Sequence, residues 1–118
     1  MEIPIDFVIR SSGTTDPEML RSYAERRLTF ALRRFENRVR HLTVRLEDIN
    51  GPRRGVDCRC SVLLQLRSGR YLEVGAITAW PFASMTLAAK RLNAALRREL
   101  EKAQQPVRRD RVSRSALP

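Results

Sequence analysis

The chain has 118 residues, 42% of them hydrophobic, and a formal net charge of +10. This length suits one compact domain and not two, and the apolar content argues against a disordered chain. Of the 23 basic residues all but Lys90 and Lys102 are arginines. Because the guanidinium group is a planar fork of donors that matches phosphate oxygens, the balance favours a polyanionic partner, nucleic acid ahead of a membrane.

The chain carries no sign of export or of membrane insertion. Its start alternates in polarity and has no apolar run after a basic stretch, so we expect no signal peptide. No segment approaches the roughly 20 apolar residues that span a bilayer. Cys58 and Cys60 are two residues apart, a spacing that suits a short disulfide loop poorly. We therefore expect a reducing cytoplasm and no membrane partner.

The first elements are a strand and a helix. Alternating polarity predicts a strand over residues 3–9 with one buried face. A helix is predicted from about residue 16 to 36, with either Thr15 or Asp16 as its N-cap; Asp16 would place Pro17 at the first helical position. Its apolar stripe has spacings of three and four and consists of Leu20, Ala24, Leu28, Ala31 and Phe35.

Three strands and a second helix follow. Alternation predicts strands over residues 39–46, 56–66 and 71–78, with a turn cluster at 50–55 and a tight hairpin at 67–70. The second helix is predicted to begin at Pro81 and to end near Gln104, before Pro106. Its buried stripe consists of Met85, Ala89, Leu92, Leu96 and Leu100.

This order, β-α-β-β-β-α, predicts an α+β two-layer sandwich: a four-stranded sheet with two helices on one face. Short connections make the last three strands antiparallel, and the first strand rejoins the sheet through a helical crossover. We expect a folded domain over residues 1–105 and a basic, mobile tail over 106–118. Four arginines and one aspartate in the tail account for +3 of the +10, which leaves +7 on the domain.

Catalytic and metal-binding patterns are weak. His41 is the only histidine and has no nearby Cys, Ser or Asp arrangement. Cys58 and Cys60 with His41 would make three metal ligands, but a Cys-x-Cys pair within a strand is more typical of two small core side chains. No glycine-rich loop leads into a helix. The sequence therefore predicts no enzyme, no cofactor, no metal site and no small-molecule substrate.

Basic residues cluster outside the apolar stripes of both helices. Some of this charge offsets a helix dipole or belongs to a solvated surface, but two such clusters on neighbouring helices favour a surface that contacts phosphates. The candidate RNA-binding residues are Arg26, Arg27, Arg33, Arg34, Arg38, Lys90, Arg91, Arg97 and Arg98.

Two aromatic residues lie off the stripes. Phe30 is either an exposed platform for stacking or, as the pattern slightly favours, packed against a neighbouring loop. Trp80 precedes the second helix, where a capping Asp or Ser would be expected, and is predicted to pack over the helix start.

Three stretches resemble the family of ribosome hibernation-promoting factors and ribosome-associated inhibitors, also called sigma factor modulation proteins. They are Tyr23–Leu28 continuing to Arg34-Phe35, the strand and turn of Val44–Arg53 with Gly55–Asp57, and Trp80–Arg98. The resemblance covers residues 3 to about 103. It implies a cytoplasmic protein that binds the small ribosomal subunit and its RNA across the messenger and transfer RNA channel, and silences translation under stress.

By position, Arg27 and Arg33 match basic positions of the family's first helix, and Arg91 and Arg98 those of the second. The family often has an Asp-Pro-Tyr-Ala-Ala-Ile-Asp type motif where this chain has Trp80–Thr86. Trp80 and Thr86 replace its two acids, and Phe82 lacks the tyrosine hydroxyl. The chain ends without the domain through which long members pair ribosomes, so we expect a short form.

Two alternatives remain open. One is a general RNA-binding or RNA-chaperone domain without ribosome specificity, similar to double-stranded RNA-binding modules, although those lack a leading strand. The other is a protein-interaction subunit that uses the open face of its sheet, where Leu63, Tyr71 and Ile77 would lie.

Overall fold

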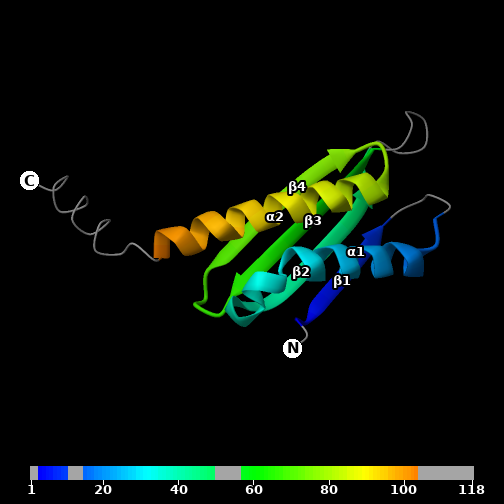
Figure 1. Ribbon diagram of the computed structural model, residues 1–118. Coiled ribbons are helices and arrows are strands. Elements are labelled where there is room, and N and C mark those ends of the chain that lie inside the picture. Colours follow the sequence, from blue (N-terminus) through cyan, green and yellow to red (C-terminus); the bar gives the residue numbers. More distant parts are fainter. Residues whose placement is uncertain (1–2, 11–14, 50–56, 104–118) are drawn as a thin grey trace, which may run out of the picture.

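The computed structural model describes residues 3–10, 15–49 and 57–103. Its elements confirm the predicted order (Figure 1): strand β1 (Ile5–Arg10), helix α1 (Pro17–Ala31), 3-10 helix η1 (Arg33–Arg38), strands β2 (Val39–Asp48), β3 (Cys58–Leu66) and β4 (Tyr71–Thr78), and helix α2 (Pro81–Ala103). The expected turn at 50–55, the boundary near residue 105 and the tail lie outside the described residues.

The four strands form one mixed sheet in the order β1-β2-β3-β4. β1 pairs parallel with β2, and the other pairs are antiparallel, as predicted. Gly69 has φ +98° in the tight connection between β3 and β4, a conformation that favours glycine. One row of partners crosses the sheet: Phe7, Val44, Val62 and Val74. Because residues directly opposite each other share a face, this row points to one side.

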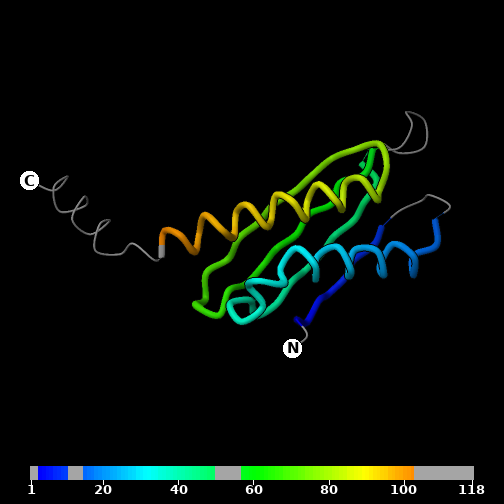
Figure 2. Tube along the Cα trace, in the orientation of Figure 1, coloured from blue at the N-terminus to red at the C-terminus, as the bar shows by residue number. Residues whose placement is uncertain are grey.

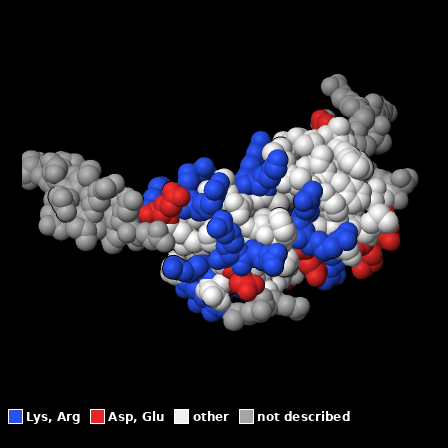
Figure 3. All heavy atoms as spheres, in the orientation of Figure 1, with Lys and Arg blue, Asp and Glu red and all other residues white. Residues whose placement is uncertain are grey.

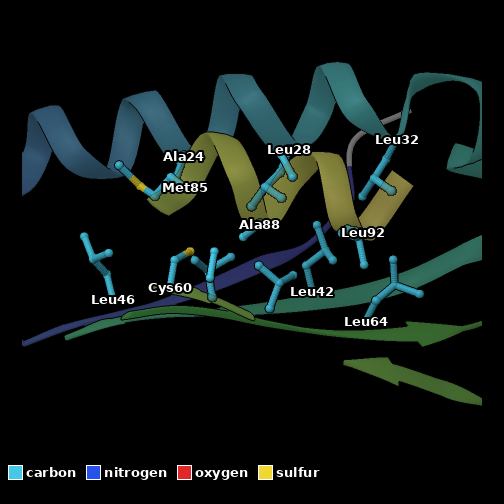
Figure 4. Packing of buried hydrophobic residues seen from close by; sticks show 14 of the residues in the cluster. Ala24, Leu28, Leu32, Leu42, Leu46, Cys60, Leu64, Met85, Ala88 and Leu92 are labelled. Atoms are coloured by element: carbon cyan, nitrogen blue, oxygen red, sulfur yellow. The ribbon is translucent and has the colours of Figure 1, made fainter. Parts of the chain in front are cut away.

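Both helices cover that one face and run in the same direction across it (Figures 1 and 2). Figure 4 shows the resulting two layers, with Leu28 and Leu92 directed from the helices toward Leu42 and Leu64 of the sheet. All four side chains are 2% exposed or less. The predicted two-layer sandwich with its helices on one face is therefore confirmed.

The first helix begins as one of the two predicted options. Oδ1 of Asp16 accepts a hydrogen bond from the backbone N–H of Glu18 at 3.1 Å, and Pro17 occupies the first turn. The α-helix ends at Ala31, however, not near residue 36, and the chain tightens into η1. The N–H of Phe35 bonds to the carbonyl of Leu32 at 2.8 Å, three residues back. Leu32 is fully buried, so it extends the core stripe where only Ala31 and Phe35 were predicted.

Helix α2 begins without the usual capping side chain. The Thr78 hydroxyl donates to the carbonyl of Trp80 at 2.6 Å and accepts from its N–H at 3.2 Å, which fixes the chain just before Pro81. The Trp80 ring meets Phe82 at an edge, with centroids 5.1 Å apart, yet stays 61% exposed. Its packing over the helix start is therefore partial.

A single side-chain hydrogen bond ties the end of α1 to the middle of α2. Nδ2 of Asn93 donates to the backbone carbonyl of Ala31 at 2.6 Å. The last carbonyls of a helix have no partner within the helix, so this bond satisfies one of them. It also fixes the spacing between the two helices at the point where η1 begins.

We predict that Asn93→Ala lowers the free energy of unfolding by about 1–2 kcal/mol, because it leaves a half-buried carbonyl without its donor. Urea denaturation measures the change. Asn37→Ala, at an exposed position of η1, is the matched control and should change stability by less than about 0.5 kcal/mol. Equal effects of the two substitutions would show that the bond to Ala31 contributes nothing.

The two cysteines are core side chains, as predicted. Both are reduced and 1% exposed, on the helix side of β3. Burial raises the pKa of Cys60 to about 12. Burial, with a hydrogen bond from the thiol to Asp48 Oδ1 at 3.3 Å, raises the pKa of Cys58 to about 11. Both thiols therefore stay protonated at neutral pH and are poor nucleophiles.

These shifts predict a loss of stability in alkali. Between the ordinary thiol pKa of 9.0 and the raised values near 11 and 12, the unfolded chain releases thiol protons that the folded chain retains. Stability therefore falls as pH rises through this window. Thermal unfolding from pH 8 to 11 tests this, with Cys58→Ala/Cys60→Ala as the comparison. The double variant should lose less stability over the range; parallel curves would contradict the prediction.

Candidate nucleic-acid interface

A groove of about 900 Å³ lies between α1 with η1 on one side and α2 on the other. Five of the nine predicted RNA-binding residues line it, and no acidic side chain among the described residues does. Figure 3, which views the molecule from the helix side, shows Lys and Arg side chains gathered over this region. The lining residues are Arg27, Phe30, Ala31, Arg33, Arg34, Thr86, Ala89, Lys90, Asn93 and Arg97.

Helical periodicity explains this convergence. In α2, Thr86, Lys90, Asn93 and Arg97 follow one another at spacings of four, three and four, so they share the face that borders α1. The same spacing in α1 relates Arg27 to residues 30 and 31, and η1 adds Arg33 and Arg34. Asn93 and Thr86 were not predicted as site residues, although their spacing from Lys90 and Arg97 was a signal that they share this face.

The other four predicted residues do not line the groove. Arg91 turns toward the sheet, where its Nη1 donates to the carbonyl of Gly75 in β4 at 2.7 Å. Arg38 lines a separate hollow beside the β3–β4 connection, together with Arg70 and Glu99. Arg26 and Arg98 are exposed on their helices outside the groove. The structure therefore brings five of the nine residues together in one groove, and their role in RNA binding stays a prediction.

In the described part of the chain, no ion pair neutralises the groove. Within the described residues, the salt bridges join Arg70 to Glu99 at 3.1 Å, Arg59 to Glu47 at 3.8 Å, and His41 to Asp6 at 3.0 Å. None of them involves a candidate RNA-binding residue. The positive charge of the groove is therefore available to a ligand.

A chain of hydrogen bonds positions Arg27 at one end of the groove. Its Nε donates to the hydroxyl of Tyr23 at 3.2 Å, and its guanidinium carbon lies 5.6 Å from the centre of that ring. The Tyr23 hydroxyl bonds to Thr86 Oγ1 at 2.7 Å, and Thr86 in turn donates to the carbonyl of Phe82 at 2.9 Å. The bonds from Thr86 and Arg27 lower the pKa of Tyr23. Tyr23 thus links the two helices and orients a groove cation.

Phe30 is 66% exposed and lines the groove. The slightly favoured prediction, packing against a loop, is therefore wrong: the ring is exposed, as in the alternative, and its use for stacking stays a prediction. At the end of α1 the side chain that reaches the core is Leu32, which is fully buried. Phe30 therefore faces outward.

The three candidate metal ligands lie apart. Cys58 pairs with Asp48 and Cys60 with Leu46 in the β2–β3 register, whereas His41 lies five to seven residues back along β2 and bonds to Asp6. At about 3.3 Å per residue, this separation is roughly 16 Å or more. Over residues 3–10, 15–49 and 57–103, no group of three or more His, Cys, Asp or Glu side chains is placed to hold a metal ion.

Two further observations concern the open face of the sheet and the crossing of a membrane. Leu63, Tyr71 and Ile77 are 38%, 58% and 51% exposed on the sheet face opposite the helices, as predicted. Neither helix in the described part of the chain combines the length and apolarity that crossing a bilayer requires.

Comparison with known proteins identifies the fold. No family model and no curated protein matches this sequence. Among solved structures, the N-terminal domain of Thermus thermophilus Protein Y superimposes with a TM-score of 0.64 at 20% identity, over 81% of this chain and 98% of that one. A ribosomal subunit interface protein from Coxiella burnetii gives 0.62 at 14% identity, with the same coverage of 81% and 98%. The chain therefore shares the fold of these two proteins over most of its length.

Proposed function

We propose that this protein is a ribosome-associated hibernation factor, a non-enzymatic translation inhibitor in the cytoplasm. It binds the RNA of the small ribosomal subunit through the groove between α1 and α2 and occupies the channel of messenger and transfer RNA. The observation that carries the proposal is the convergence of Arg27, Arg33, Arg34, Lys90 and Arg97 on one groove that no acidic side chain lines.

The charge of the groove supports an RNA partner. Four of its five cations are arginines, whose guanidinium groups bind phosphate oxygens in a bidentate manner. Together with the ammonium group of Lys90 they place five cations on the walls of one groove, which suits a backbone that carries a charge at each nucleotide. Contacts of this kind position a protein on RNA and carry little sequence information, so shape must supply much of the specificity.

The fold supports the ribosome as the source of that RNA. One similar structure is described as a ribosomal subunit interface protein, and this chain resembles the hibernation-factor family in its first helix, its second strand and its last helix. Double-stranded RNA-binding modules have the order α-β-β-β-α, whereas β1 here pairs parallel with β2 at the edge of the sheet. The leading strand therefore favours the hibernation-factor fold over the general RNA-binding alternative.

The proposed mechanism is occlusion. Arginine–phosphate contacts hold the two packed helices against ribosomal RNA, and the bulk of the sandwich excludes messenger and transfer RNA from the same space. No covalent bond is made or broken, so inhibition is reversible. Its strength falls as ionic strength rises, because salt weakens the arginine–phosphate contacts.

We predict that Arg34→Gln/Arg97→Gln weakens binding to purified small ribosomal subunits and reduces the slope of log affinity against log salt concentration by about 1.5, because two phosphate contacts are lost. Co-sedimentation over a series of KCl concentrations measures both quantities. Thermal unfolding of the variant should show no loss of stability relative to the wild type, because neither arginine forms an ion pair within the described residues and the substitutions relieve repulsion between groove cations.

The matched control is Arg40→Gln/Arg45→Gln, which removes the same charge from exposed positions of β2. It should retain most of the affinity. Equal losses in the two double variants would mean that net charge alone, and not the groove, attracts RNA. If the wild type does not sediment with subunits at low salt, the ribosome proposal is wrong. Equal affinity for random duplex RNA would favour the general RNA-binding alternative.

A further inference from the structure

Phe30 is the most exposed large hydrophobic side chain among the described residues, at 66%. It lies in the last turn of α1 and lines the same groove as the five cations. An aromatic ring in water contributes nothing to the core, and the fold does not require one at this position. A ring surrounded by positive charge does suit a ligand that has both an aromatic face and phosphates.

We propose that the groove holds an unpaired nucleotide of RNA, with its base stacked on Phe30 and its neighbouring phosphates bound by cations of the two helices. This inference rests on the proposed function in one respect, that the groove holds RNA. It goes further by naming the state of that RNA, single-stranded, and the residue that distinguishes it from duplex.

The chemistry of the groove distinguishes single-stranded RNA from duplex RNA. In an A-form duplex the base faces are stacked on one another, so a protein meets only phosphates, 2′-hydroxyls and base edges. The cations alone would suffice for such a surface. An unpaired base offers its flat face to an aromatic side chain, and such stacking tolerates any base. Phe30 therefore adds affinity only where a base is unstacked.

The floor of the groove leaves room for a base. The residues between the cationic walls include Ala31 and Ala89, whose methyl groups occupy little volume, and Ala89 is buried beneath the groove at 4% exposure. Asn93 holds the helices together at this level through its bond to the Ala31 carbonyl. The space beside Phe30 is thus preformed, so a base enters it without separating the helices.

A second exposed ring lies along the same path. A neighbouring hollow is lined by Tyr23, Trp80 and Phe82 and shares Thr86 and Lys90 with the groove. Trp80 there is 61% exposed. The two hollows thus adjoin each other, with an exposed aromatic ring in each, which suits a single strand that runs along the helices more than a rigid duplex.

The test uses fluorescence anisotropy with labelled decauridylate, a single strand, and with a ten-base-pair RNA duplex. We expect Phe30→Leu, which keeps an apolar side chain but removes the ring, to weaken decauridylate binding about tenfold and duplex binding less than twofold. Phe30→Trp should retain the wild-type affinity. Tyr71→Leu removes an exposed ring from the opposite sheet face and should change neither.

The outcomes separate this inference from the proposed function. If Phe30→Leu weakens both ligands equally, or neither, the stacking proposal is wrong. If the wild type fails to bind decauridylate yet sediments with ribosomes, the inference falls and the ribosome proposal stands. If decauridylate binding depends on the ring but ribosomes are not bound, the stacking inference stands and the ribosome proposal is wrong.

Discussion

The one-sided burial of the sheet is the constraint on which the rest of this structure depends. In β2 and β3, alternate residues such as Val44 and Val62 are buried while their neighbours are not. Apolar surface therefore exists on one face only, and both amphipathic helices must cover it. Since both run in the same direction (Figure 1), the carboxyl-terminal half of α1 and the following η1 lie beside the middle of α2, where Lys90 and Arg97 project. The groove is a consequence of how the core is buried.

The electrostatics of the groove oppose folding and favour binding. Two like charges about 10 Å apart repel each other by ~1.7 kcal/mol at an effective dielectric constant of 20. With five cations and no acid in the lining, such repulsion is relieved by bound anions or salt. Arg91 shows the contrast, because its guanidinium bonds to a backbone carbonyl of β4. Basic residues on the same helix therefore differ in role: Arg91 is structural, whereas Lys90 and Arg97 are available to a ligand.

Periodicity in the sequence was sufficient to predict the elements, their order, the buried faces and the presence of basic residues outside the apolar stripe of α2. It could not predict which of these basic residues border α1. Lys90 and Arg97 flank the apolar stripe on one side, and Arg91 and Arg98 flank it on the other. The choice depends on which side of α2 the first helix packs, and that is a tertiary property. The end of α1 was missed for a related reason: the burial of Leu32 against the sheet competes with continued α-helix.

That competition also explains the exposed ring. Residues 30 and 32 lie about 200° apart around an α-helix, so their side chains cannot both reach the core. Leu32 is fully buried, and Phe35 follows it onto the same side because residues three apart eclipse in a 3-10 helix. Phe30 must then face away from the sheet, into the groove. Any polar residue at position 30 would satisfy the fold, so the core gives no reason for a ring there, and this is why Phe30 supports the proposal of a stacked base.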